Sequence, residues 1–189
     1  KGIISASYLN LEKLRGKTIL ITGVSGMLAT YLAYTIYYLN IHENFQTKII
    51  GTARNMAKAN AKFQNVSKEY FELIQHDVTE PLEYEGAIDY IIHAASNASP
   101  KFISTDPVGI IKANTLGTMN LLELSRKKTI QNFLFLSTRE IYGKSIKNSL
   151  TEQDYGGFDI LSPRACYPES KRMAETLLES YAVQYKIPY

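Results

Sequence analysis

Tyr167 and Lys171 are the residues whose types and spacing point most directly to chemistry. Of fourteen tyrosines, Tyr167 alone is followed by a lysine four residues later. Residues i and i+4 share one face of a helix, so the phenol and the ammonium can point into the same cleft. A phenol is a poor base at neutral pH, but a neighbouring cation favours the phenolate. The pair could therefore exchange a proton with a substrate hydroxyl, or it could be a chance pairing on a surface helix.

A strand, a glycine turn and a helix follow one another near the N-terminus. Residues 17–22 predict a strand, a glycine-containing turn comes next, and apolar residues up to position 39 predict a helix. The first glycine permits the tight turn, and the second lets the backbone approach a pyrophosphate at the helix N-terminus. The alternative is an ordinary strand–helix turn. We expect five residues here to bind a dinucleotide: Gly23, Ser25, Gly26, Met27 and Leu28.

Further strands alternate with helices along the chain. The pattern predicts strands over 47–52, 70–75, 88–93 and 132–137, and helices over 54–64, 107–127 and 167–185. Such alternation predicts an α/β fold with a doubly wound parallel sheet, and ligands then lie at the carboxyl ends of the strands. Residues 148–161 are expected to form a long loop.

Composition limits the classes of function. The 189 residues are 45% hydrophobic, which predicts one globular domain with a real core. The net charge is +3 and the basic residues are scattered, which argues against nucleic acid as a partner. No apolar run reaches the length of a membrane span, and there is no signal peptide, so we expect no membrane partner and a cytoplasmic protein. The single Cys166 excludes an internal disulfide, and the three histidines show no metal-ligand spacing.

Small and polar residues follow the third and fourth predicted strands. Asp77, with Val78, comes after the third, where a carboxylate can accept a hydrogen bond from an adenine amino group; an Asx turn is the alternative. Ala94, Ala95 and Ser96 come after the fourth, where a flat cofactor can lie over small side chains, unless the loop binds nothing.

Two hydroxyls and a carboxylate follow the fifth predicted strand, in the run from Ser137 to Glu140. The hydroxyl of Thr138 can hold a substrate oxygen while Tyr167 takes its proton; a cap at the strand end is the alternative. Polar groups at the ends of several strands on one sheet edge would be unlikely to occur together unless they formed a binding site.

With these residues assembled, the chain resembles the extended short-chain dehydrogenase/reductases, and within them the NAD-dependent nucleotide-sugar epimerases, dehydratases and decarboxylases. The resemblance runs from Lys17 to the end of the chain. It is carried by the TGxxGxxA pattern at 22–29, the YxxxK pattern at 167–171, the Asn114 segment NTLGT, and Thr138 before an IYG run. Asp77 and Val78 fall on the family's adenine contacts.

Longer stretches at 72–82, 93–100 and 163–167 resemble the UDP-glucuronate decarboxylases in particular. Glu140 matches a glutamate that those decarboxylases share with the sugar 4,6-dehydratases. Arg139 departs from the pattern, because decarboxylases usually carry a small residue there.

The resemblance implies transient oxidation of a nucleoside-diphosphate sugar. Tyr167 takes the proton of the sugar 4-hydroxyl while hydride leaves C4 for the nicotinamide. Lys171 assists Tyr167 and binds the nicotinamide ribose, Thr138 holds the 4-oxygen, and Asn114 contacts the cofactor. The 4-keto sugar can then be re-reduced on the other face, lose water or lose carbon dioxide. Glu140 is expected to act on C5 or C6, which favours a dehydratase or decarboxylase over a 4-epimerase.

NAD is the cofactor that the resemblance implies. Relatives that use NAD usually carry an acidic residue after the second strand, whereas this chain reads GTARN at 51–55. Arg54, with Lys58 nearby, could instead meet the 2′-phosphate of NADP, or the two could be a solvated helix start. NAD stays the prediction and NADP stays open.

The resemblance also implies a Rossmann fold, a homodimer formed through the long helices, and a substrate domain beyond Tyr189. Residues 1–189 are thus expected to be the NAD(P)-binding domain at the N-terminal end of a longer enzyme. A dinucleotide-binding sensor without catalytic activity is the alternative from another class. The joint presence of Thr138, Tyr167 and Lys171 argues against it.

Overall fold

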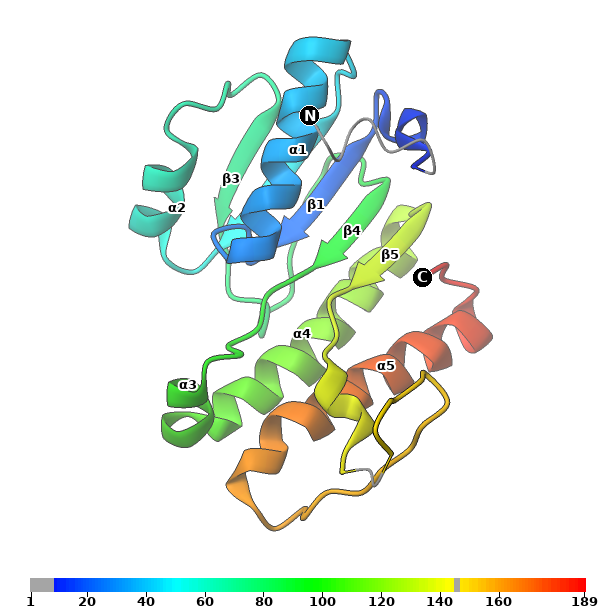
Figure 1. The fold of residues 1–189 in the computed structure, drawn as a ribbon. Helices are drawn as coiled ribbons and strands as arrows, with labels where there is room; N and C mark the ends of the chain where they lie inside the picture. Colours follow the sequence, from blue (N-terminus) through cyan, green and yellow to red (C-terminus); the bar gives the residue numbers. More distant parts are fainter. Residues whose placement is uncertain (1–8, 145–146) are drawn as a thin grey trace.

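A single parallel sheet organises the computed structural model, which describes residues 9–144 and 147–189 (Figure 1). The strand order is β3-β2-β1-β4-β5. The strands are β1 (Thr18–Thr22), β2 (Lys48–Ala53), β3 (Phe71–Gln75), β4 (Tyr90–His93) and β5 (Asn132–Phe135). All neighbouring strands pair in parallel. The order reverses between β1 and β4, and such a switch point is where ligands bind in doubly wound folds.

Helices cover both faces of the sheet (Figure 1). The helices α1 (Met27–Glu43) and α2 (Met56–Phe63) pack on one face, and α4 (Pro107–Lys128) and α5 (Cys166–Tyr185) pack on the other. A shorter helix, α3 (Pro100–Thr105), precedes α4. Three 3-10 turns complete the described elements: η1 (Leu11–Leu14), η2 (Arg139–Tyr142) and η3 (Pro163–Ala165).

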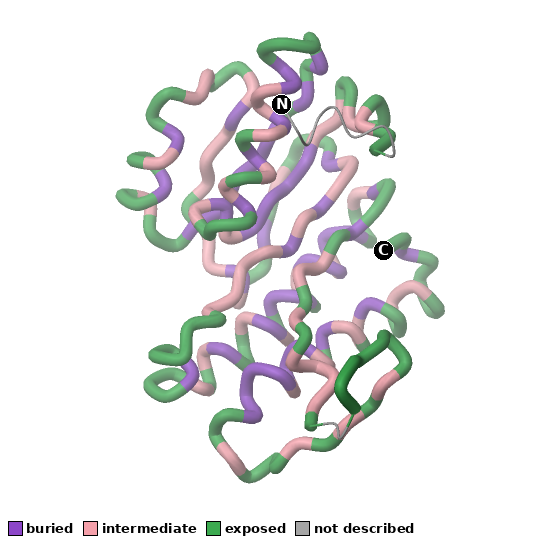
Figure 2. The backbone as a smooth tube through the Cα atoms, in the orientation of Figure 1, coloured by how far each residue is buried: buried purple, intermediate pink, exposed green. Residues whose placement is uncertain are grey.

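Alternation along the central strand explains the two-sided core. In β1, Ile19 and Ile21 pack with residues of α1 and α2, while Leu20 packs with residues of α4 and α5. All three are at most 1% exposed. Figure 2 shows the burial following the strands of the sheet. A parallel sheet buried on both faces needs apolar residues at successive positions, which is why these strands read as continuous apolar runs. The doubly wound parallel fold predicted from the sequence is therefore confirmed.

Most predicted elements agree with the structure within two residues, and the differences lie at ends and in short turns. The strand expected over 88–93 begins at Tyr90, and the one expected over 132–137 ends at Phe135. The register pairs His93 with Phe135, so β5 has no strand neighbour beyond the end of β4. The helix α3 was missed, because six residues show no clear helical period. Residues 148–161 contain no helix or strand, although Gly157 forms a single antiparallel bridge with Lys144.

Within the described ranges, no helix is long and apolar enough to cross a membrane. The same residues contain no group of three or more His, Cys, Asp or Glu side chains that could hold a metal ion.

Candidate functional site

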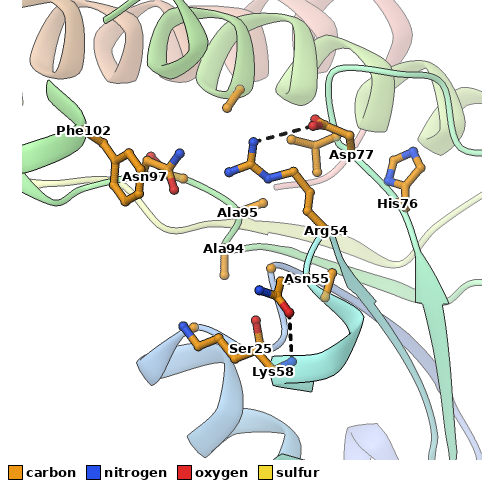
Figure 3. Close-up of a pocket in the computed structure, with 16 residues that line it drawn as sticks. Ser25, Arg54, Asn55, Lys58, His76, Asp77, Ala94, Ala95, Asn97 and Phe102 are labelled. Carbon is orange, nitrogen blue, oxygen red and sulfur yellow. Dashed lines mark hydrogen bonds and ion pairs between the residues drawn. The ribbon is translucent and has the colours of Figure 1, made fainter. Parts of the chain in front are cut away.

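A cavity of about 410 Å³ lies at the carboxyl ends of β1, β2, β3 and β4, at the switch point of the sheet (Figure 3). This volume is in the range of small-molecule sites. Nine of the residues predicted to bind cofactor line it, although they come from four separate segments: Gly23, Ser25, Gly26, Arg54, Asp77, Val78, Ala94, Ala95 and Ser96. The fold thus brings the predicted glycine turn and the predicted strand ends to one place.

The glycine turn fits a site where backbone must approach a ligand. Gly23 has φ +62°, and a Cβ added there would lie 2.7 Å from the Cα of Ala95. A Cβ on Gly26 would lie 3.1 Å from the Gly23 carbonyl oxygen, which already accepts a 2.8 Å hydrogen bond from the Gly26 N–H. Helix α1 begins directly after the turn without a side-chain cap. Its first N–H groups are thereby left available to an anion such as a pyrophosphate.

Met27 and Leu28 form the first turn of α1 but do not line the cavity. Their side chains are largely exposed, at 70% and 57%. Their part in dinucleotide binding stays a prediction, and it would involve their backbone N–H groups.

A buried contact between Thr22 and His93 fixes the floor of the cavity. The Thr22 hydroxyl oxygen accepts hydrogen bonds from the N–H groups of Ala94 and Ala95, each at 3.2 Å. It lies 2.8 Å from Nδ1 of His93. Burial, and secondarily the charge of Lys171, lower the pKa of His93 to about 3, so the imidazole is neutral. Because the hydroxyl hydrogen then goes to Nδ1, we assign the ring proton to Nε2.

Asp77 uses its two carboxylate oxygens differently. Oδ1 accepts hydrogen bonds from the N–H and the hydroxyl of Thr79, at 3.0 and 2.9 Å, which is the Asx-type turn left open by the sequence. Oδ2 lies 3.6 Å from Nη1 of Arg54 (Figure 3). Burial would raise the pKa of Asp77, but the Thr79 hydrogen bonds and the Arg54 charge outweigh it, and the pKa lies below its usual value. The carboxylate is therefore ionised.

Two buried polar atoms of the cavity wall have no hydrogen-bond partner among the described residues. They are Oγ of Ser96 and Nδ1 of His76. Buried polar groups in proteins are nearly always hydrogen-bonded, so unpaired ones at a cavity indicate that a ligand completes them. Together with the glycine turn and the small side chains of Ala94 and Ala95, they make the cavity fit a dinucleotide.

Tyr167 and Lys171 form a second, buried group that does not line this cavity. Nζ of Lys171 donates a 2.6 Å hydrogen bond to the Leu136 carbonyl oxygen and lies 4.3 Å from the ring centroid of Phe135. Burial lowers the pKa of Lys171 to about 8, although the charge of Glu175 opposes the shift. Tyr167 is 7% exposed.

Asn114 joins α4 to α5 beside this group. It is fully buried, and its side-chain amide donates a 2.8 Å hydrogen bond to the Ser170 hydroxyl. The Ser170 hydroxyl in turn donates to the Tyr167 carbonyl oxygen at 3.1 Å. Oδ1 of Asn114 has no partner in the described part of the chain. These contacts hold the start of α5 against α4.

Thr138 and Glu140 lie on the segment that follows β5. Oγ1 of Thr138 accepts a 3.3 Å hydrogen bond from the Glu140 N–H, so Thr138 caps η2. The Glu140 carboxylate accepts two hydrogen bonds from Nη2 of Arg164, at 2.9 and 2.7 Å. Neither residue lines the cavity. Lys171 binds the same segment through the Leu136 carbonyl oxygen. The Tyr167 side chain packs with Ile103 and Ile110.

A model of the NAD dependent epimerase/dehydratase family matches residues 19–189. The chain belongs to this family.

The epimerase/dehydratase family includes close curated relatives of the chain. UDP-glucuronic acid decarboxylase 1 of Xenopus tropicalis is 38% identical over 172 residues, which cover 89% of this chain and 38% of the relative. UDP-glucuronic acid decarboxylase 6 of Arabidopsis thaliana is 38% identical over 169 residues, covering 89% and 47%. The chain therefore spans less than half the length of these relatives.

Solved structures support the family's fold. A mutant UDP-glucuronic acid 4-epimerase from Bacillus cereus, in complex with a UDP-sugar and NAD, aligns with a TM-score of 0.71 at 20% identity, covering 90% of this chain and 54% of the other. The dTDP-glucose 4,6-dehydratase from Bacillus anthracis, in complex with NAD, aligns with a TM-score of 0.64 at 22% identity, covering 91% and 52%.

Several residues of this family member's site were not found from the sequence. Thr22 and His93 belong to stretches that carried the resemblance, but the contact between their side chains, which joins residues 71 positions apart, was not predicted. Arg164 and Ser170 lie within the stretch that carried the resemblance, yet their partners are 24 and 56 residues away. Nothing in the local pattern reveals such pairs.

Proposed function

We propose that this protein transiently oxidises C4 of a nucleoside-diphosphate sugar, with UDP-glucuronate as substrate and loss of carbon dioxide as the outcome. The observation that supports it best is the buried group at the start of α5. There a lysine with a pKa of about 8 lies one turn from Tyr167 and is bound to the segment that carries Thr138. The sequence identity to UDP-glucuronic acid decarboxylases supports the choice of substrate. Loss of water, as in a 4,6-dehydratase, and 4-epimerisation are the alternatives.

A nicotinamide dinucleotide supplies one part of this chemistry when bound, because it accepts and returns a hydride. The glycine turn and the floor formed by Ala94 and Ala95 would hold it. The family's description and the solved structures with NAD support NAD as the cofactor. Arg54, which directly follows β2, leaves NADP as the alternative.

The chain's own residues would move and hold protons. We assign Tyr167, as the phenolate, to accept the proton of the sugar 4-hydroxyl. The ammonium of Lys171 would balance the negative charge that Tyr167 carries as the base. Oγ1 of Thr138 accepts its internal hydrogen bond from Glu140, which leaves the hydroxyl hydrogen to be donated to the substrate oxygen.

Glu140 is the residue that we assign to the later step at C5 or C6. The two hydrogen bonds from Arg164 orient its carboxylate and keep a counter-charge beside it. Arg164 is thus proposed as a positioning residue.

We further propose a cytoplasmic homodimer. Apolar side chains are exposed along both long helices: Val108, Ile111, Leu116 and Met119 on α4, and Met173 and Val183 on α5. Exposed apolar surface of this kind is typical of a protein interface. The one cysteine, Cys166, is a buried free thiol, which agrees with a reducing compartment.

The test compares the full-length protein with its Tyr167→Phe variant. We expect the wild type to develop transient absorbance of reduced nicotinamide with UDP-glucuronate and to release a product lighter by carbon dioxide. Tyr167→Phe should lower turnover by about 10²- to 10⁴-fold while dinucleotide binding is unchanged, because proton transfer by a positioned group contributes about that much.

Tyr155→Phe is the matched control, because Tyr155 is 86% exposed in the loop before η3. Near-normal turnover of Tyr167→Phe would contradict the assignment. Dinucleotide binding without an absorbance change for UDP-glucuronate or dTDP-glucose would instead favour the non-catalytic sensor.

A further inference from the structure

His93 lies between the cavity with its glycine turn and the buried group that contains Lys171. It is the last residue of β4, and it stands opposite Thr22 of β1 on one side and Phe135 of β5 on the other. Its side chain is 1% exposed and does not line the cavity, so a ligand held there would not touch it. A histidine in this place can act on a ligand only through its neighbours.

We propose that His93 is a positioning residue with two separable roles. Through Nδ1 it fixes the backbone on which the dinucleotide lies, and through its ring it holds Phe135 against the Lys171 ammonium. The inference rests on the proposed function. It joins the dinucleotide site to the acid/base residues through one side chain.

The Thr22 hydroxyl explains why Nδ1 matters to the cavity. Its oxygen accepts hydrogen bonds from the N–H groups of Ala94 and Ala95, at 3.2 Å each, and these occupy both of its lone pairs. The hydroxyl hydrogen is left for Nδ1 of His93, at 2.8 Å, and this contact fixes the rotation of the hydroxyl. Without that acceptor the hydroxyl would turn towards another partner and release one of the two N–H groups.

Ala94 and Ala95 are the residues whose position depends on this contact. Both line the cavity (Figure 3), and a Cβ added to Gly23 would lie 2.7 Å from the Cα of Ala95. Thr22 directly precedes Gly23, so its hydroxyl joins the turn after β1 to the turn after β4. A dinucleotide lying between these turns would depend on the distance that separates them.

The His93 ring also packs against two aromatic rings of β5. Its centroid lies 5.6 Å from that of Phe135 and 6.4 Å from that of Phe133. The Phe135 ring in turn faces Lys171, whose Nζ lies 4.3 Å from the ring centroid. Because an aromatic face within about 6 Å attracts an ammonium group, holding the Phe135 ring helps to hold Nζ in place.

Both roles require a neutral imidazole. Burial, together with the nearby charge of Lys171, lowers the pKa of His93 to about 3. A protonated ring would offer no acceptor at Nδ1 and would place a second positive charge near the Lys171 ammonium. At neutral pH, Nδ1 is therefore an acceptor.

Two substitutions in the full-length protein separate the two roles. His93→Asn keeps an acceptor oxygen near the place of Nδ1 but removes the ring, whereas His93→Phe keeps a ring and removes the acceptor. We expect His93→Phe to weaken NAD binding about tenfold in calorimetry and to change kcat at saturating NAD less than about twofold. We expect His93→Asn to change NAD affinity less than about twofold and to lower kcat with UDP-glucuronate about tenfold.

Variants of the neighbouring residues test each role independently. Thr22→Val, which removes the hydroxyl, should weaken NAD binding as His93→Phe does. The double variant should bind NAD no more weakly than either single variant, because both changes remove the same contact. Phe135→Leu should lower kcat as His93→Asn does. If a variant at position 93 does not fold, the matching neighbour variant decides the same role.

Thr47→Val is the matched control for Thr22→Val. Thr47 is also fully buried, and its hydroxyl donates a 2.7 Å hydrogen bond to the Leu14 carbonyl oxygen, but it does not line the cavity. Both variants should lower the melting temperature, and Thr47→Val should leave the NAD affinity unchanged.

The crossed pattern supports the inference: NAD affinity falls with loss of the acceptor, and kcat falls with loss of the ring. Equal losses of both quantities in His93→Asn and His93→Phe would show a purely structural role and overturn it, as would unchanged values in both. NAD binding by the wild type without turnover of UDP-glucuronate would contradict the proposed function and the role of the ring, whereas the NAD affinities would still decide the role of Nδ1. Binding of no dinucleotide overturns both proposals.

Discussion

Replacing Lys171 with methionine should make the protein more stable at neutral pH while it removes activity. The Lys171 ammonium is buried, with 3% of the residue exposed, and burial lowers its pKa from 10.5 to about 8. Among the residues that the structure describes, Nζ has one hydrogen-bond acceptor, the Leu136 carbonyl oxygen at 2.6 Å, and it also lies over the face of the Phe135 ring. Methionine has a similar length and carries no charge.

The pKa shift sets the size of the effect. The difference between 10.5 and about 8 is about 2.5 pKa units. At 1.36 kcal/mol per unit, the buried ammonium lowers the free energy of unfolding by about 3 kcal/mol at neutral pH. The variant also loses the hydrogen bond to Leu136, which costs about 1–2 kcal/mol. We therefore expect Lys171→Met to be about 1–2 kcal/mol more stable than the wild type at about pH 7.

The sign of the pH dependence follows from the direction of the shift. Because the folded-state pKa is below the unfolded-state pKa, the unfolded chain binds more protons between about pH 8 and about pH 10.5. The wild type therefore gains stability relative to the variant as the pH rises through this window. Between about pH 7 and about pH 9.5 the relative gain should be about 2 kcal/mol, enough to cancel the advantage of the variant.

Urea unfolding of both proteins across this pH range measures the difference in their free energies of unfolding. The ionisable groups that both proteins contain contribute equally to each value, so they do not affect the difference. Lys112→Met is the matched control, because Lys112 is exposed on α4, and its stability curve should run parallel to that of the wild type. A difference between Lys171→Met and the wild type that stays constant with pH would refute the argument. It would mean that the buried ammonium is solvated in a way that the structure does not show.

Two further substitutions test the positioning of the site. Gly23→Ala should weaken dinucleotide binding at least about tenfold and lower the melting temperature more than Gly16→Ala does. Both glycines have positive φ, which costs an alanine about 1 kcal/mol, but only at Gly23 would the new Cβ lie 2.7 Å from backbone, whereas Gly16 has open space. Equal losses in calorimetry and thermal melts would contradict this reasoning. Arg164→Met should lower kcat about tenfold by releasing the Glu140 carboxylate, while Arg139→Met, which removes an exposed arginine next to Glu140, should change it little. Similar kcat values for both variants would remove the positioning role.

The architecture could be predicted from the sequence because it depends on local periodicity. Apolar runs bounded by glycine and polar residues predicted five strands. The helices α2, α4 and α5 were predicted within two residues of their ends, whereas α1 continues four residues beyond the predicted end at position 39. The elements that were not predicted, α3 and the 3-10 turn η2, are too short for a helical period to appear in the sequence. The end of β5 could not be predicted, because it depends on where its neighbour β4 stops.

The candidate site could be predicted only in part. The glycine turn and the small residues after β4 were recognised because their residue types are unusual at strand ends, and they line the cavity. The contact between Thr22 and His93 was not predicted, although it joins two strand ends beneath that cavity. Both residues look like the last positions of ordinary strands, and their pairing arises only when β1 and β4 lie side by side.

The sequence by itself determined the fold class, the family and the chemical groups available to the site. The tertiary structure decided which of these groups are buried and which neighbours they have. It buries the ammonium of Lys171 against Leu136, divides the Asp77 carboxylate between Thr79 and Arg54, and engages Glu140 with Arg164. The physical reason is that backbone propensities act over a few residues, whereas burial and charge pairing depend on partners that are brought close only by packing.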